Sequence, residues 1–155
     1  MKIATAMSAA LVLSAGAALA PALAKAPAAI TVSHPWIAAP PGGAPTAAGY
    51  ATITNTGAAA DTFLGATTAE ADKLELHTMS MTGGIMRMRP VSGGVSIPAG
   101  QSLTLLPNGR YHFMLVRPKH PLKVGDKAPA VLTFSRAGAI KVTFVVEPAA
   151  GMTMN

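Results

Sequence analysis

The chain has 155 residues, of which 50% are hydrophobic, 12% are charged and none is cysteine. Without cysteine, neither disulfides nor thiolate metal ligands are available, so packing has to stabilise the fold. The formal net charge of +6 comes from Lys and Arg side chains that are scattered along the sequence. A nucleic-acid groove needs clustered basic residues interleaved with exposed aromatic side chains, so the composition argues against a nucleic-acid partner.

Residues 1–24 have the pattern of a secretory signal peptide. Lys2 gives a positive start, Ile3–Leu23 is apolar and rich in alanine, and Ala22-Leu23-Ala24 is a small-residue cleavage signal. An uncleaved anchor is the alternative, but small and polar residues interrupt a segment that would need about 20 strongly apolar residues to span a bilayer. We therefore expect a periplasmic protein with no membrane span after cleavage. Lipid attachment is excluded there, because no cysteine follows the apolar stretch.

Cleavage after Ala24 would leave 131 of the 155 residues, enough for one domain with its own core. We expect this domain to span residues 25–148, followed by a flexible C-terminal tail over residues 149–155. The tail contains Met152 and Met154 and no histidine.

Short β-type runs separated by turn residues fill the expected domain, and no stretch keeps a helical apolar period for three turns. Glycine, proline and asparagine pairs punctuate the chain so that each run has about five to eight residues. This pattern predicts an all-β fold, an antiparallel Greek-key β-sandwich or barrel. The predicted strands are Ile30–Trp36, Ala48–Asn55, Leu74–Met81, Ile85–Val91, Val95–Ile97, Ser102–Leu106, Arg110–Arg117, Pro129–Phe134 and Ile140–Val146.

A methionine-rich hairpin is predicted around Gly83-Gly84, a pair that suits a two-residue turn with positive φ at both positions. If these glycines form the turn, residues whose numbers sum to 167 face each other. Side chains alternate along strands, so one face then carries His77 and four methionines, Met79, Met81, Met86 and Met88. Leu74, Leu76, Thr78, Ser80, Arg87 and Arg89 lie on the other face.

Methionine most often fills gaps in a core, and the methionine face of this hairpin could simply be its core side. The segment Arg110–Arg117 favours a different interpretation. There Tyr111, Phe113 and Leu115 form an aromatic and aliphatic face that suits the core, while His112 and Met114 lie on the opposite side. A histidine and a methionine two residues apart on an outer face suit metal binding better than packing.

Donor chemistry indicates the metal. Neutral thioethers combined with imidazoles suit Cu(I), whereas Zn(II) usually draws on thiolate or carboxylate, and Ca(II) or Mg(II) on oxygen. A blue-copper electron-transfer centre needs a cysteine thiolate, which the chain lacks. The residues therefore predict copper storage or delivery.

At these residues the sequence resembles the PCu(A)C family of periplasmic copper chaperones. The family pattern is a histidine, a methionine eleven positions later and a downstream His-x-Met, which here correspond to His77, Met88, His112 and Met114. The surrounding sequence segments are also similar to the family, among them DKLELHTM, GGIMRMRPV and SIPAGQSLTLLPNGRYHFML. The match extends over roughly Thr31–Pro148.

The resemblance implies a cupredoxin-like β-sandwich with Cu(I) bound by His77, Met88, His112 and Met114. It also implies delivery of Cu(I) toward the CuA centre of cytochrome c oxidase. The partners would be the copper subunit of that oxidase or a thiol-bearing copper assembly protein. Two departures stand out: the segment between Met88 and His112 is one or two residues longer than is usual in the family, and the tail lacks the histidines that some members use for a second copper.

Several other residues lie near the predicted site or share its residue types. His34 and His120 fit ordinary surface positions, and Trp36 and Tyr50 fit core aromatics. Met79 is the strongest substitute ligand because it faces Met88, and Glu75 could orient His77. Met81 and Met86 could either surround the metal or pack.

No serine lies in a nucleophile-elbow context and the six carboxylates are dispersed, so we expect a protein that is not an enzyme. Two alternatives to a chaperone stay open. One is a periplasmic copper sequestration or resistance protein without a dedicated acceptor. The other is a β-sandwich scaffold with methionines in its core.

Overall fold

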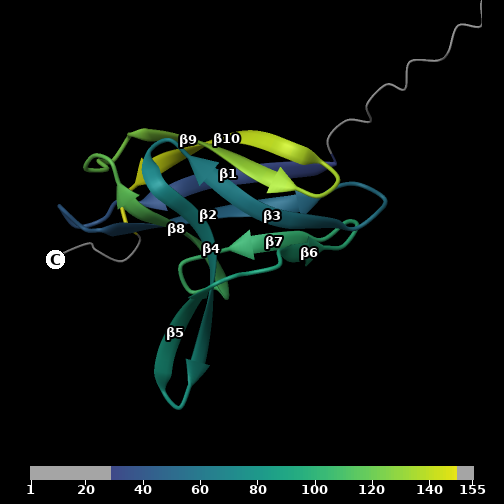
Figure 1. Ribbon diagram of the computed structural model, residues 1–155, viewed down its shortest axis with the longest axis horizontal. Helices are drawn as coiled ribbons and strands as arrows, with labels where there is room; N and C mark the ends of the chain where they lie inside the picture. The colour runs from purple at the N-terminus through teal and green to yellow at the C-terminus, as the bar shows by residue number, and fades with distance from the viewer. Residues whose placement is uncertain (1–28, 150–155) are drawn as a thin grey trace, which may run out of the picture.

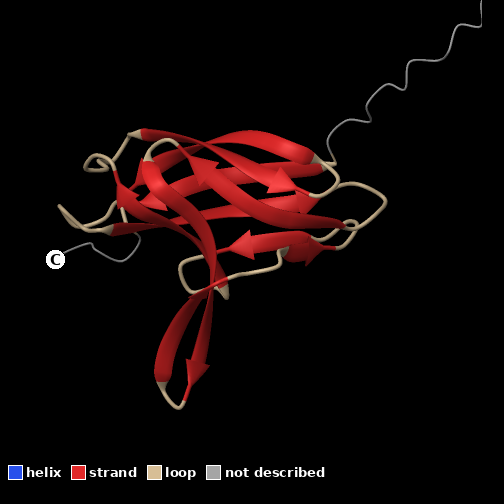
Figure 2. Cartoon of the chain, viewed as in Figure 1, coloured by secondary structure: helices blue, strands red, loops and turns tan. Residues whose placement is uncertain are grey.

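The computed structural model describes residues 29–149, and within this range every regular element is a β-strand (Figure 2). This confirms the predicted all-β class. The predicted signal peptide and residues 150–155 of the predicted tail lie outside the described residues. The ten strands are β1 Ile30–Ala38, β2 Thr46–Asn55, β3 Asp61–Thr68, β4 Ala71–Thr82, β5 Ile85–Pro90, β6 Val95–Ile97, β7 Ser102–Leu105, β8 Tyr111–Pro118, β9 Lys127–Phe134 and β10 Gly138–Glu147.

Seven strands close into a barrel, and the others extend it. The pairing order β4-β8-β2-β1-β10-β9-β3 returns to its start through a contact between β3 and β4 at Ala66 and Leu74. Strand β5 continues the sheet beyond β4, β6 pairs with β3, and β7 pairs with β2. The β4–β5 hairpin extends away from the barrel as a separate arm (Figure 1).

The sheet departs from the predicted antiparallel pattern at one seam, and the predicted fold class holds. Strand β1 runs parallel to β10, with Trp36 level with Val145 and Ala38 level with Glu147. The two strands come from opposite ends of the domain, so no hairpin turn constrains their direction. All other pairings are antiparallel.

Four phenylalanines fill the centre of the barrel. Phe63 meets Phe113 and Phe134 edge to face, with ring centroids 5.9 and 5.6 Å apart, and Phe113 meets Phe144 in the same way at 5.6 Å. Each of these side chains is at most 2% exposed. Such offset aromatic pairs add to the stabilisation that burial provides.

Strand β3 was not predicted. Its sequence DTFLGATT offers only Phe63 as a large inward side chain, while Leu64 is 53% exposed and Gly65 interrupts the pattern. The strand forms because both of its edges pair, with β9 on one side and β6 on the other. Tyr50 is buried, at 8% exposure, as expected of a core aromatic, whereas Trp36 is only partly buried. Their rings meet at a tilt of 40° with centroids 4.7 Å apart, outside the main core cluster.

A buried carboxylate ties β3 to the β9–β10 turn. Asp61 is 4% exposed and accepts hydrogen bonds from the backbone N–H groups of Thr62, Arg136 and Ala137, and from the Ser135 hydroxyl, at 2.7 to 3.3 Å. Burial alone would raise the pKa of Asp61, but these hydrogen bonds outweigh it and hold the pKa below its usual value.

We expect Asp61→Ala to lower the free energy of unfolding by roughly 2–4 kcal/mol, because three part-buried N–H groups lose their acceptor. The matched control is Asp72→Ala, which removes an exposed pair with Arg117 at 2.6 Å and is expected to cost less than about 1 kcal/mol. Urea unfolding measures both. A carboxylate whose pKa is depressed by folding stabilises the fold fully only when the pH is above the pKa of the unfolded state. The difference in unfolding free energy between wild type and Asp61→Ala should therefore shrink below about pH 4. Equal losses in the two variants would contradict the role of Asp61.

Candidate metal centre

The β4–β5 hairpin has the predicted register. Gly83 and Gly84 form its turn with φ of 59° and 76°, and Met79 lies opposite Met88 and Met81 opposite Met86. A two-residue turn with positive φ at both positions matches the twist of the flanking strands, which explains why the glycine pair sets the register.

The methionine face of the hairpin points away from the core. On β4, Leu74 and Leu76 are 4% and 5% exposed and pack into the barrel, so alternation turns His77 and Met79 outward. Along the arm, Met81, Met86 and Met88 are 66%, 60% and 53% exposed. The interpretation of these three methionines as core residues is therefore wrong.

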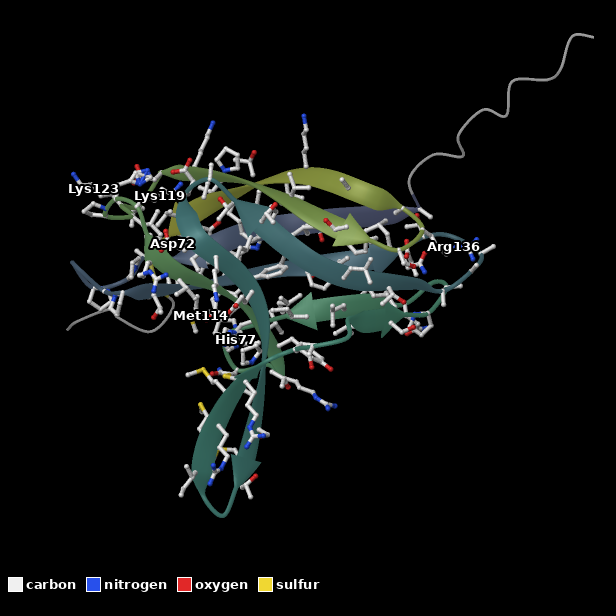
Figure 3. The ribbon with its side chains drawn as sticks, viewed as in Figure 1. Asp72, His77, Met114, Lys119, Lys123 and Arg136 are labelled. Atoms are coloured by element: carbon white, nitrogen blue, oxygen red, sulfur yellow. The ribbon has the colours of Figure 1, made fainter. Side chains whose placement is uncertain are left out.

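The structure places His77 directly opposite His112 in the β4–β8 ladder. Their imidazole centroids are 5.7 Å apart and their planes meet at 65°. Met114 lies on the same outward face, two residues from His112 and opposite Glu75. The predicted inward face of β8 is confirmed, because Phe113 and Leu115 are 0% and 1% exposed. His77 and Met114 lie where the arm leaves the barrel (Figure 3).

The histidine pair marks a fork in the sheet. The β4–β8 ladder ends at Thr78, and a last hydrogen bond runs from the Met79 N–H to the Arg110 carbonyl at 2.7 Å. On the other side of β4, the Val91 N–H donates to the Leu76 carbonyl at 2.8 Å, which returns the chain to the barrel. His77 is thus held by both neighbouring strands, whereas Met88 belongs to the free arm.

His112 is only 3% exposed although it lies on the outward face of β8. The β2–β8 register, continued by one residue, brings Tyr50 level with His112, and the Tyr50 ring meets that of Trp36 at a tilt of 40°. Burial lowers the pKa of His112, and the nearby His77 lowers it further. His112 is therefore neutral at neutral pH and keeps a lone pair for a metal.

Both imidazoles carry an unsatisfied nitrogen. The Nδ1 atoms of His77 and His112 are buried, and neither has a hydrogen-bond partner. His77 Nε2 lies 3.2 Å from Glu75 Oε2, as the prediction that Glu75 could orient this ring requires. A carboxylate can only accept here, so Nε2 carries the proton and Nδ1 presents its lone pair. A buried polar atom without a partner costs roughly 1–3 kcal/mol, and two on directly opposed residues are typical of a binding site.

The remaining histidines lie at the surface, as predicted. His34 pairs with Glu147 at 2.8 Å and stacks on Trp36, and His120 pairs with Glu70 at 2.8 Å. Neither lies in the ladder that holds the His77–His112 pair. Among residues 29–149, no helix is long and apolar enough to cross a membrane.

The barrel and its outward imidazoles and thioethers define a cupredoxin-like domain of the PCuAC class. The PCuAC domain of PmoF1, solved without metal, is 27% identical with a TM-score of 0.65, covering 77% of this chain and 94% of that domain. The Cu(I) form of DR1885 from Deinococcus radiodurans is 30% identical with a TM-score of 0.57, covering 78% of each chain.

The chain belongs to the LpqE-like family. The family model described as "Putative lipoprotein LpqE-like" matches residues 30–146, nearly the whole barrel. The chain is also 33% identical over 126 residues to "Putative lipoprotein Lxx21020" of Leifsonia xyli subsp. xyli (strain CTCB07), covering 81% of this chain and 74% of that protein. In contrast to these names, the present 155 residues contain no cysteine that could carry a lipid.

We expect His77 to populate the tautomer with the proton on Nε2 in the metal-free protein at pH 8, because Glu75 accepts from that nitrogen. Nitrogen-15 NMR of the imidazoles measures the tautomer directly. In Glu75→Leu the preference should weaken, whereas Glu70→Leu, which removes the partner of His120, should leave His77 unchanged. A dominant Nδ1–H tautomer in the wild type would contradict this assignment.

Proposed function

We propose that this chain is an exported Cu(I) metallochaperone that holds the metal with His77, Met88, His112 and Met114. The observation that carries the proposal is the pair of buried Nδ1 atoms without partners, on directly opposed strands beside outward thioethers. The Cu(I) form of the structural relative DR1885 supports the choice of metal.

The donor set fits the transport of a soft monovalent ion. Four neutral ligands bind Cu(I) without first losing a proton, except that each histidine must be neutral. Burial keeps His112 neutral, and Glu75 orients His77. The histidines form the rigid half of the site because the β4–β8 ladder holds both, while Met88 on the arm is 53% exposed.

This division of the ligands suggests how the metal leaves. An incoming thiolate can displace the thioether of Met88 at the surface first, and the remaining ligands can then exchange one at a time. Thiolates bind Cu(I) more tightly than thioethers, so the transfer proceeds toward a cysteine-bearing acceptor. We propose the CuA centre of cytochrome c oxidase, reached directly or through a thiol-bearing copper assembly protein, as the destination.

The compartment follows from the same proposal. The apolar alanine-rich segment of residues 1–24 acts as a cleaved signal peptide, which directs the domain of residues 25–148 to the periplasm. The lipoprotein names of the family and of the Leifsonia relative support export.

We expect a competition titration with a chromophoric Cu(I) chelator to reveal one tight site that the His112→Ala, Met114→Ala double variant lacks. The affinity should fall by more than about 100-fold, because removing a ligand weakens binding more than removing a residue that only hydrogen-bonds to a ligand. Met88→Leu, which keeps the side-chain volume, should weaken binding by at least about tenfold. Full affinity in the double variant would contradict the site.

Met79→Leu is the matched control for Met88, because the two methionines face each other and differ in the proposed role. We expect Met79→Leu to change the affinity of the tight site by less than about threefold. A larger loss in Met79→Leu than in Met88→Leu would assign the fourth ligand to Met79 instead.

We expect the Cu(I) protein to load a metal-free, soluble CuA domain of cytochrome c oxidase. The transfer should persist in the presence of a chelator that traps free Cu(I), because ligand exchange occurs within the complex. Appearance of copper in the acceptor, followed after rapid separation, measures it. Retention of the metal at equilibrium would favour the alternative, a copper sequestration protein without a dedicated acceptor.

A further inference from the structure

The free arm carries more thioethers than the proposed centre uses. Met79 is half-buried at its base, and Met81 and Met86 lie opposite each other further out, each at least 60% exposed. All three project from the same face as Met88. Exposed methionines add little to stability, so packing does not explain why this face is so rich in them.

A cavity of about 400 Å³ lies against these three side chains. Its lining combines Met79, Met81 and Met86 with Ser80 and the loop of residues 107–110 that leads into β8. No carboxylate and no histidine lines it. The donors available to a ligand are therefore chiefly the three thioethers, a set that suits a soft monovalent cation.

The register lets the three sulfurs converge. Met81 and Met86 form a direct cross-strand pair, whose Cβ atoms in such pairs are about 4.5–5.5 Å apart, and Met79 is diagonal to Met86 at about 7–8 Å. Each methionine has three rotatable bonds beyond its backbone, so the sulfurs can reach a common ion without any movement of the strands.

We propose that Met79, Met81 and Met86 form a second, weaker Cu(I) site on the arm, adjacent to the histidine centre. The site is weaker because it has no imidazole and because the positively charged residue Arg110 is among those that line the cavity. Met79 lies two residues from His77 on β4, so an ion could pass from the arm to the histidines along one strand face.

The proposal concerns the same metal as the proposed function but depends on different residues, so the two can fail separately. The test is an anaerobic Cu(I) titration of the full chain against chelators of graded affinity. We expect the wild type to bind two equivalents, the second at least about tenfold more weakly than the first, in keeping with the unfavourable Arg110 charge.

Three double variants show which residues bind each of the two equivalents of Cu(I). Met81→Leu, Met86→Leu should lose only the weak one, and His112→Ala, Met114→Ala only the tight one. Met152→Leu, Met154→Leu, which removes the tail thioethers, should keep both. Leucine preserves side-chain volume, and the arm residues are exposed, so folding should be unaffected.

Ag(I), a redox-inert substitute for Cu(I), gives an independent readout through methyl NMR of the methionines. Past the first equivalent, the methyl signals of Met79, Met81 and Met86 should shift together. A single equivalent in the wild type would overturn the second site. So would loss of the weak equivalent in the tail variant, or its survival in the arm variant.

Discussion

The antiparallel pairing of β4 with β8 is the constraint on which the rest of the structure depends. Its inward residues, Leu76 opposite Phe113 and Leu74 opposite Leu115, form one wall of the barrel core. Alternation then places His77 opposite His112 on the other face. A shift of one residue would turn the imidazoles into the core and the leucines toward solvent, so hydrophobic burial fixes the geometry of the proposed metal centre.

Burial of His112 determines its protonation state and leaves its Nδ1 atom without a hydrogen-bond partner. Desolvation keeps the ring neutral, and the unsatisfied Nδ1 atoms of both histidines cost the metal-free fold stability. The aromatic core and the Asp61 hydrogen bonds offset that cost at a distance. The donors are consequently in place before any ion arrives, so little ordering is required on binding, at least for the two residues of the ladder.

How much the sequence reveals depends on whether a contact is local. The hairpin register could be predicted because Gly83 and Gly84 form a two-residue turn, and such a turn fixes which residues of the two strands face each other. The outward position of His112 followed from alternation with Phe113. Its near-complete burial did not, because it depends on the pairing of β8 with β4 and β2, strands that are distant from it in the sequence.

Contacts between distant strands account for the other differences. The opposition of His77 and His112 depends on the register of β4 against β8, which no turn links directly. Strand β3 has too few large inward side chains to show a strand pattern, and it is ordered by pairing on both edges. The parallel β1–β10 seam likewise joins the two ends of the domain, where local sequence carries no signal of direction.

The exposed arm shows the opposite balance of forces from the barrel. Its strand residues beyond Met79 are all exposed, and it is held chiefly by its own ladder, so its methionines are free to change rotamer. Free thioethers are weak, neutral and fast-exchanging donors, whereas the ladder histidines are rigid. The proposed carrier function needs both kinds of donor, because rigid donors alone would retain the ion and mobile donors alone would not select it. The fork at His77, where β4 leaves β8 and continues only with β5, brings the two kinds of donor together.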